Sequence, residues 1–157
     1  METLVPPATC HHARTRVTTE RPMEFIDLTD RIEALAAQAG IHAGIVNIQS
    51  LHTTTAIVVN EHEPLLLADF GALLSRAAPR DAAYRHDDMS ARTVNLAPHE
   101  RPNGHAHCQA LLLPSSATLN VAGGRLQLGR WQRVFLVELD GPRVRDVSIL
   151  VLGEAMH

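Results

Sequence analysis

The chain has 157 residues, 45% of them apolar, and a formal net charge of −3 at pH 7 with neutral histidines. This length predicts a single domain, and the mixed, slightly acidic charge argues against nucleic-acid binding through bulk positive charge. No apolar run approaches the roughly 20 residues that cross a bilayer, the first residues lack a secretory signal, and two isolated cysteines form no disulfide framework. We expect a cytoplasmic protein with neither a membrane nor a nucleic-acid partner.

The first part of the chain predicts a strand followed by a helix. Residues 1–13 contain two prolines and predict a flexible lead-in to a single domain over residues 14–157. Thr and Val are frequent in residues 14–20, as is typical of an edge strand. Apolar residues then recur at helical spacing after Thr29 and stop at Gly40, which predicts a helix.

Two strands, a second helix and a long loop are expected next. Residues 44–50 and 56–59 predict the strands, and Pro64 suits the first turn of a helix that ends at Ala78. Residues 81–104 show no clear periodicity. Long structureless loops within compact domains are usually functional, so we expect a functional role for this one.

The last third of the chain is rich in strand-forming residues. Strands are predicted at residues 107–113, 116–121, 125–128, 132–139 and 144–152. Gly123-Gly124 and Asp140-Gly141 predict hairpin turns. Consecutive hairpins form an antiparallel meander, so the pattern as a whole predicts an α+β fold.

Several histidines lie in polar stretches of the chain. Neutral imidazole is a common metal ligand and a common general base near neutral pH. If the strand starts at His105, the side chains of His105 and His107, two positions apart, point to the same side with Cβ atoms about 6–7 Å apart. One ion or phosphate would meet both rings; alternatively, one ring faces solvent. His52 precedes three threonines including Thr54, and His86 is flanked by aspartates.

Two charged residues complete the candidates that come from the residues alone. Glu61 follows an apolar strand and is a candidate general base or ligand, or else a charge that favours the start of a helix. Arg143 follows Gly141-Pro142 and suits a phosphate or carboxylate, with a surface salt bridge as the alternative. No P-loop, His-Glu-x-x-His motif, dinucleotide fingerprint or Gly-x-Ser-x-Gly elbow is present.

Short motifs spread over nearly the whole chain resemble those of a known family. In chain order they are Leu51-His52-Thr53-Thr54-Thr55-Ala56, Asn60-Glu61, Tyr84-Arg85-His86, Asn103-Gly104-His105-Ala106-His107, Gly129-Arg130-Trp131-Gln132 and Glu138-Leu139-Asp140-Gly141-Pro142-Arg143. From about Arg14 to Glu154 the chain resembles the YjbQ-like family, whose members are often named secondary thiamine-phosphate synthases. The resemblance implies an antiparallel β-sandwich with two or three helices packed on one side, and a homotrimer with clefts between subunits.

The resemblance also implies an activity and a set of site residues. The reaction would join a pyrimidine diphosphate to a thiazole phosphate and release pyrophosphate, with a divalent metal ion, zinc or magnesium, neutralising the departing charge. The implied catalytic residues are His52, His86, His107 and Glu61, and the same three histidines are the implied metal ligands. The implied residues for binding the small phosphorylated substrate are His105, Thr54, Arg143 and Trp131.

Two alternatives use the same residues. One is a non-catalytic trimer that binds a metal or a phosphorylated metabolite, and the other is a metal-dependent hydrolase.

Three positions depart from the family pattern. Arg130 replaces the small hydroxyl residue usual before the Trp-Gln pair, Pro114 replaces a glycine, and His62 replaces an asparagine. Arg130 adds a positive charge that would alter the cleft.

Overall fold

The computed structural model describes residues 8–155. The strands in this range are β1 (Ala8–Thr18), β2 (Glu24–Asp27), β3 (Ile41–Ser50), β4 (Thr55–Glu61), β5 (Ser116–Ala122), β6 (Arg125–Leu126), β7 (Gln132–Glu138) and β8 (Val144–Ala155). The helices are α1 (Thr29–Gln38), α2 (Pro64–Ala77), α3 (Gly104–Leu111) and the one-turn 3₁₀ helix η1 (Arg85–Asp87). The predicted α+β class with antiparallel strands is confirmed.

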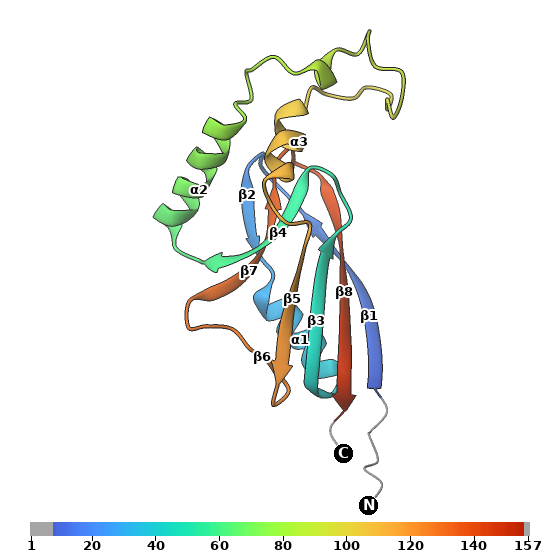
Figure 1. The fold of residues 1–157 in the computed structure, drawn as a ribbon, viewed down its shortest axis with the longest axis vertical. Helices are drawn as coiled ribbons and strands as arrows, with labels where there is room; N and C mark the ends of the chain where they lie inside the picture. Colours follow the sequence, from blue (N-terminus) through green and yellow to red (C-terminus); the bar gives the residue numbers. More distant parts are fainter. Residues whose placement is uncertain (1–7, 156–157) are drawn as a thin grey trace, which may run out of the picture.

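The strands form two antiparallel sheets. One sheet has the order β1-β8-β3-β5-β6 and the other β2-β7-β4. The long strands of the first sheet lie side by side, with β8 hydrogen-bonded to both β1 and β3 (Figure 1). The predicted consecutive meander is therefore wrong beyond β6, because β7 leaves the first sheet and joins the second. The predicted turn at Gly123-Gly124 is confirmed, and both glycines have the positive φ that a tight hairpin requires.

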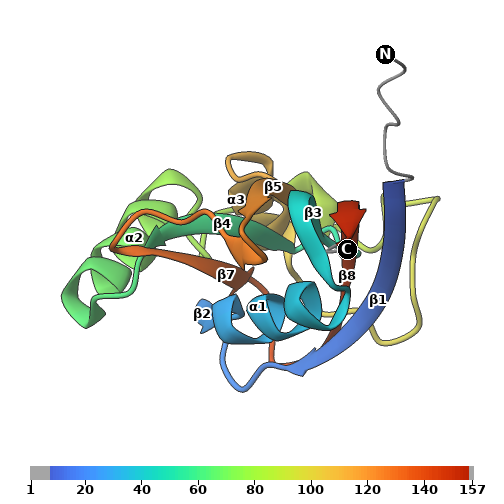
Figure 2. The same ribbon diagram turned by 90° about the horizontal axis from the view of Figure 1, so that it is seen from below.

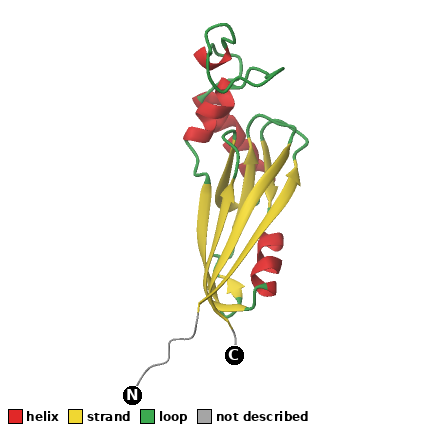
Figure 3. Ribbon diagram, turned by 90° about the vertical axis from the view of Figure 1, so that its right-hand side faces the viewer, coloured by secondary structure: helices red, strands yellow, loops and turns green. Residues whose placement is uncertain are grey.

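Strand β7 lies between the two hydrophobic cores of the molecule, and both of its faces are buried. Val134 and Leu136 pack into one core with the five-stranded sheet and α1, whereas Phe135 and Val137 pack into a second core with α2 and α3. A strand with a core on each face is apolar at consecutive positions, as residues 134–137 of β7 are. The helices therefore lie on both faces of the small sheet and not on a single side, with α1 apart from α2 and α3 (Figures 2 and 3).

Two boundaries differ from the sequence prediction. Residues 8–13, predicted as part of a flexible lead-in, pair with β8 as the first half of β1; residues 1–7 lie outside the described range. The predicted strand at residues 107–113 is instead mostly helix α3. Its first turn is stabilised by Asp87, whose Oδ1 accepts hydrogen bonds from the backbone N–H groups of Asn103 (2.9 Å) and Gly104 (2.8 Å). A carboxylate from outside the segment thus favours a helix that its own composition does not indicate.

The segment between α2 and α3 extends beyond one end of the two sheets (Figures 1 and 3). It contains η1 as its regular structure, in agreement with the irregular stretch predicted over residues 81–104. None of the helices within residues 8–155 combines the length and apolar character that crossing a bilayer requires. The segment instead lies beside the β3–β4 turn and the start of β8, where it closes one side of a polar cleft.

Candidate functional site

A polar cleft of about 510 Å³ lies at this end of the molecule. The turn between β3 and β4 contributes His52 and Thr54, η1 contributes His86, and α3 contributes His107. Arg143 precedes β8 and also lines the cleft. The structure thus brings five of the predicted site residues, from four remote stretches of sequence, around one cavity.

His86 and His107 are in direct contact within the cleft. Their ring centroids are 4.5 Å apart, and the rings meet edge to face. The Asp87 carboxylate that binds the start of α3 belongs to η1, so it holds the element carrying His86 against the element carrying His107. The Nε2 atom of His86 is buried, lies 3.6 Å from Oε1 of Glu100, and has no hydrogen-bond partner among residues 8–155.

His52 is held in a defined protonation state. Its Nε2 accepts a 2.8 Å hydrogen bond from the backbone N–H of Asp146, so the proton of the neutral ring is on Nδ1. Burial, followed by the positive charge of Arg145, lowers the pKa of His52. Burial, followed by the charge of His86, likewise lowers the pKa of His107. Both effects favour neutral imidazoles at pH 7.

Each arginine of the cleft is paired with a carboxylate. Arg92 contacts Glu100 at 2.6 Å, Arg143 contacts Asp140 at 2.7 Å, and Arg145 contacts Glu138 at 2.6 Å. Arg145 and Glu138 are both buried, whereas the side chain of Arg143 is 40% exposed. Arg143 binds Asp140 through Nη2, and no residue in the described range binds its Nε or Nη1. Arg143 is the most exposed of the three cleft arginines, so its remaining donors are the most accessible to a ligand.

Three predicted site residues lie elsewhere. His105 and His107 are separated by about 200° around helix α3 instead of sharing one side of a strand, and His105 is buried beside a separate small cavity with Gln109. Glu61 pairs with Gln132 at the far end of β4, while Thr55 at the other end is next to the cleft. Trp131 lies beside that far end, exposed and stacked under the guanidinium of Arg130 at 4.5 Å. Arg130 therefore adds no charge to the cleft within one chain.

Several cleft residues did not stand out in the sequence. Asn103 occurs in a family motif but is not among the predicted site residues, and neither is Arg145. Arg92 and Glu100 lie in the aperiodic segment, and only the fold pairs them. Thr54 is buried, and its Oγ1 accepts a hydrogen bond from Arg145 at 3.1 Å, so it supports the floor of the cleft.

The predicted three-histidine metal set does not fit this arrangement. His52 has one ring nitrogen occupied by the Asp146 amide, and the other carries the proton. Within residues 8–155, no three or more His, Cys, Asp or Glu side chains are placed to hold one ion. His86 and His107 do fit part of a metal site, because the orphaned Nε2 of His86 lies beside a second imidazole and the Glu100 carboxylate.

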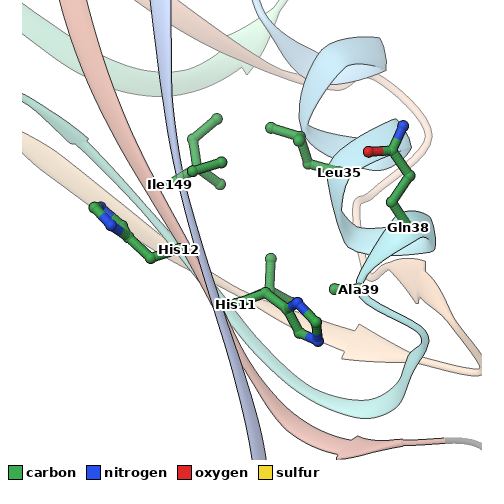
Figure 4. Close-up of a pocket in the computed structure, with 8 residues that line it drawn as sticks. His11, His12, Leu35, Gln38, Ala39 and Ile149 are labelled. Atoms are coloured by element: carbon green, nitrogen blue, oxygen red, sulfur yellow. The ribbon is translucent and has the colours of Figure 1, made fainter.

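A second cavity, of about 280 Å³, separates β1 from α1. Figure 4 shows the ring of His11 on the α1 side of β1 and that of His12 on the other side. His12 is hydrogen-bonded to Ser148 at 2.8 Å. Leu35, Ala39 and Ile149 line the cavity, and it contains none of the residues of the polar cleft.

A family model, sequence relatives and solved structures all match nearly the whole chain. The model of the family described as "UPF0047 protein YjbQ-like" matches residues 13–154. A UPF0047 protein of Methanothermobacter thermautotrophicus is 38% identical over 136 residues, which is 87% of each chain. The UPF0047 protein YugU of Bacillus subtilis is 32% identical over 138 residues, covering 88% of this chain and 96% of the relative. The crystal structure of a YbjQ-like protein of unknown function from Sulfolobus solfataricus has a TM-score of 0.84 at 34% identity, covering 94% of this chain and 100% of that one.

Proposed function

The chain belongs to the UPF0047 YjbQ-like family, and we propose that it binds a small phosphorylated metabolite in the polar cleft and acts on it by acid–base chemistry. The contact between His86 and His107 carries the proposal. Two touching imidazoles disfavour a double positive charge, so the pair suits a single transferable proton. A neutral His107, favoured by its lowered pKa, is the base of this pair.

Arg143 supports the phosphate half of the proposal. A planar guanidinium with unused donors matches the geometry of phosphate oxygens, and Asp140 fixes its position through Nη2. His52 supplies a further N–H donor, since its proton is on Nδ1. Because each cleft arginine is matched by a carboxylate, these donors bind an anion without a large excess of positive charge.

The reaction that we propose first is the one implied by the resemblance. The C–O bond between the pyrimidine methylene and its diphosphate breaks, a C–N bond to the thiazole nitrogen forms, and pyrophosphate leaves. In this chain Arg143 would bind phosphate, and His86 and His107 would exchange a proton with the bound substrate. The charge of departing pyrophosphate exceeds what the paired arginines neutralise, so the assay contains magnesium or zinc.

The experiment combines binding with turnover. Calorimetric titration of a phosphate monoester into the wild type, Arg143→Met and His107→Gln tests the site, and formation of thiamine phosphate tests the reaction. We expect Arg143→Met to weaken binding at least tenfold and His107→Gln to abolish turnover while retaining binding. The matched control His42→Gln changes an exposed histidine of β3. Equal binding by all four proteins contradicts the proposal, and release of inorganic phosphate identifies a hydrolase instead.

A metal-binding protein without turnover is the second candidate. The buried, unpartnered Nε2 of His86 beside His107 and Glu100 favours it, because such an atom suits a bound cation. Titration with zinc and with magnesium, monitored by the histidine NMR signals, tests it directly. Binding lost in His107→Gln but retained in His42→Gln supports this candidate, and unchanged His86 and His107 signals at saturating metal contradict it.

The predicted homotrimer is part of the proposal. Support comes from α2, which is strongly apolar although Leu74 is its one buried residue. Leu65 and Leu73 on the same helix are 75% and 57% exposed in the single chain. An exposed apolar helix face is typical of a protein–protein interface. Sedimentation equilibrium of the wild type and Leu65→Lys tests it: three copies are expected for the wild type, and a monomeric wild type contradicts the proposal.

A further inference from the structure

We infer that Asn103 determines the specificity of the cleft by accepting a hydrogen bond from a hydroxyl or amino group of the phosphorylated ligand. This inference rests on the proposed function, since it assumes that Arg143 binds a phosphate. Asn103 lines the cleft and is only 5% exposed. Its Oδ1 atom is buried without a hydrogen-bond partner among residues 8–155.

The orientation of the Asn103 amide is fixed by its neighbour. Nδ2 donates a 3.2 Å hydrogen bond to Oδ2 of Asp140, and the same oxygen contacts Nη2 of Arg143 at 2.7 Å. A carboxylate paired with a guanidinium is ionised and can only accept hydrogen bonds. The amide must therefore present its NH₂ group to Asp140, which leaves Oδ1 directed away from it.

Asp87 takes over the helix-capping role that the side-chain oxygen of an N-cap asparagine usually has. Asn103 is the N-cap of α3, a position where an asparagine oxygen normally accepts a hydrogen bond from the first turn. Here no side-chain capping bond forms. Asp87 instead accepts the N–H groups of Asn103 and Gly104. Helix capping thus leaves Oδ1 unused, and a buried carbonyl oxygen without a donor is unfavourable unless a ligand or water supplies one.

The chemical class of the ligand follows from the shared carboxylate. Asn103 and Arg143 are both anchored on a single oxygen of Asp140, so the acceptor and the guanidinium have a fixed spacing. A ligand that contacts both must carry a phosphate and, a few bonds away, an O–H or N–H donor. Hydroxyalkyl and aminoalkyl phosphate monoesters have this arrangement. An alkyl phosphate of the same length leaves Oδ1 unsatisfied.

A matched pair of probes tests the inference. Glycerol 3-phosphate and n-propyl phosphate share a three-carbon chain, but only the first carries hydroxyl donors. We expect the wild type to bind glycerol 3-phosphate about tenfold more tightly, as one good hydrogen bond allows. Asn103→Ala should remove this preference, so that the variant binds the two probes with equal affinity. The control Asn120→Ala, on the exposed face of β5, should retain the preference.

The outcomes separate the two proposals. Equal affinity of the wild type for both probes overturns the role of Asn103 but leaves phosphate binding intact. No binding of either probe overturns the phosphate site and, with it, the inference. The wild-type comparison decides the question even if Asn103→Ala fails to fold, and far-UV circular dichroism establishes whether it does. A preference that persists in folded Asn103→Ala assigns the hydroxyl contact to another residue and overturns the inference.

Discussion

Arg145 clamps the carboxylate of Glu138 with two hydrogen bonds of 2.6 Å, from Nε to Oε2 and from Nη2 to Oε1. The same Oε1 accepts the backbone N–H groups of three consecutive residues, 139–141, at 2.8–3.0 Å. This buried pair therefore determines the course of the β7–β8 turn. That turn carries Asp140 and Arg143 to the cleft, so the shape of the site depends on an ion pair beneath it.

Replacing Arg145 with Met should destabilise the protein strongly. The substitution leaves the buried charge of Glu138 without its partner, and breaking a buried ion pair in this way costs about 3–5 kcal/mol. Urea unfolding monitored by circular dichroism measures the change in the free energy of unfolding. Arg125→Met, at an exposed position of β6, is the control. A loss no larger than that of the control contradicts the prediction.

The protein should lose stability in acid over a defined range. Burial alone would raise the pKa of Glu138, but hydrogen bonds from Arg145 and from backbone amides lower it to about 2, from 4.5. Asp27 is likewise lowered from 3.8 to about 2, against the effect of burial, chiefly by its hydrogen bond from Arg133. A lowered carboxyl pKa stabilises the folded state above the unfolded value, and this contribution is lost as pH falls through the folded value.

We therefore expect the free energy of unfolding to decrease from about pH 4.5 to pH 2. Urea unfolding at half-unit pH steps measures the slope. Asp27→Asn should flatten the acid part of the profile, whereas Glu20→Gln, at an exposed site, should not. A slope in Asp27→Asn as steep as that of the wild type would show that this carboxyl contributes nothing to acid unfolding.

The cleft histidines should add a second dependence on pH, near neutrality. The pKa of His52 and that of His107 lie below the reference value of 6.5 in the folded protein, because of burial first and of neighbouring positive charge second. The unfolded chain then binds more protons near pH 6 than the folded chain does. Stability is consequently greatest above the unfolded pKa and decreases as pH falls through 6.5 towards the folded values.

Thermal unfolding between pH 5 and 8 tests this dependence. His52→Gln retains an acceptor for the Asp146 amide but does not titrate, so its melting temperature should vary less with pH than that of the wild type. His42→Gln replaces an exposed histidine and should follow the wild type. Identical pH profiles for His52→Gln and the wild type would contradict the expectation.

Gly104→Ala should disturb the cleft by displacing the start of helix α3. A Cβ atom at this position would lie 2.5 Å from Cβ of Tyr84, so the start of α3 must move away from η1. Such overpacking costs about 1–3 kcal/mol and should separate His107 from His86. The melting temperature and the affinity for a phosphate monoester are the measurements.

Gly71→Ala in α2 is the matched control for this substitution. Its new Cβ would meet Cγ of Met23 at 3.4 Å, an ordinary contact, and alanine favours a helix by about 0.5–1 kcal/mol over glycine. We expect unchanged or slightly higher stability and unchanged affinity for this variant. If Gly104→Ala behaves like Gly71→Ala, the close approach of α3 to η1 is not important for the site.

Local patterns in the sequence were sufficient for much of the fold. The 3.6-residue periodicity after Thr29 and the proline at position 64 predicted α1 and α2, and the paired glycines at 123 and 124 predicted the β5–β6 hairpin. Helix α3 was missed because eight residues give too little periodicity to separate helix from strand. Its capping carboxylate, Asp87, is distant in sequence, and this error placed His105 beside His107.

The cleft was only partly accessible from sequence. Polar surroundings singled out His52, His86 and His107, but the contact between His86 and His107 depends on how η1 meets α3. Glu61 is a candidate from its position after an apolar strand and Trp131 from a family motif, and the β4–β7 register places both at the opposite end of the strands. The pairing of Arg145 with Glu138 joins β8 to the end of β7, a tertiary relationship without a local signal.

The position of β7 between the two cores has a consequence for how the molecule unfolds. Val134 and Leu136 belong to one core, while Phe135 and Val137 belong to the other. Water cannot enter either core without loosening a strand on which the other depends. The two halves should therefore melt together as one cooperative unit, whereas the segment between α2 and α3 buries few side chains and should open at a lower free energy than either core.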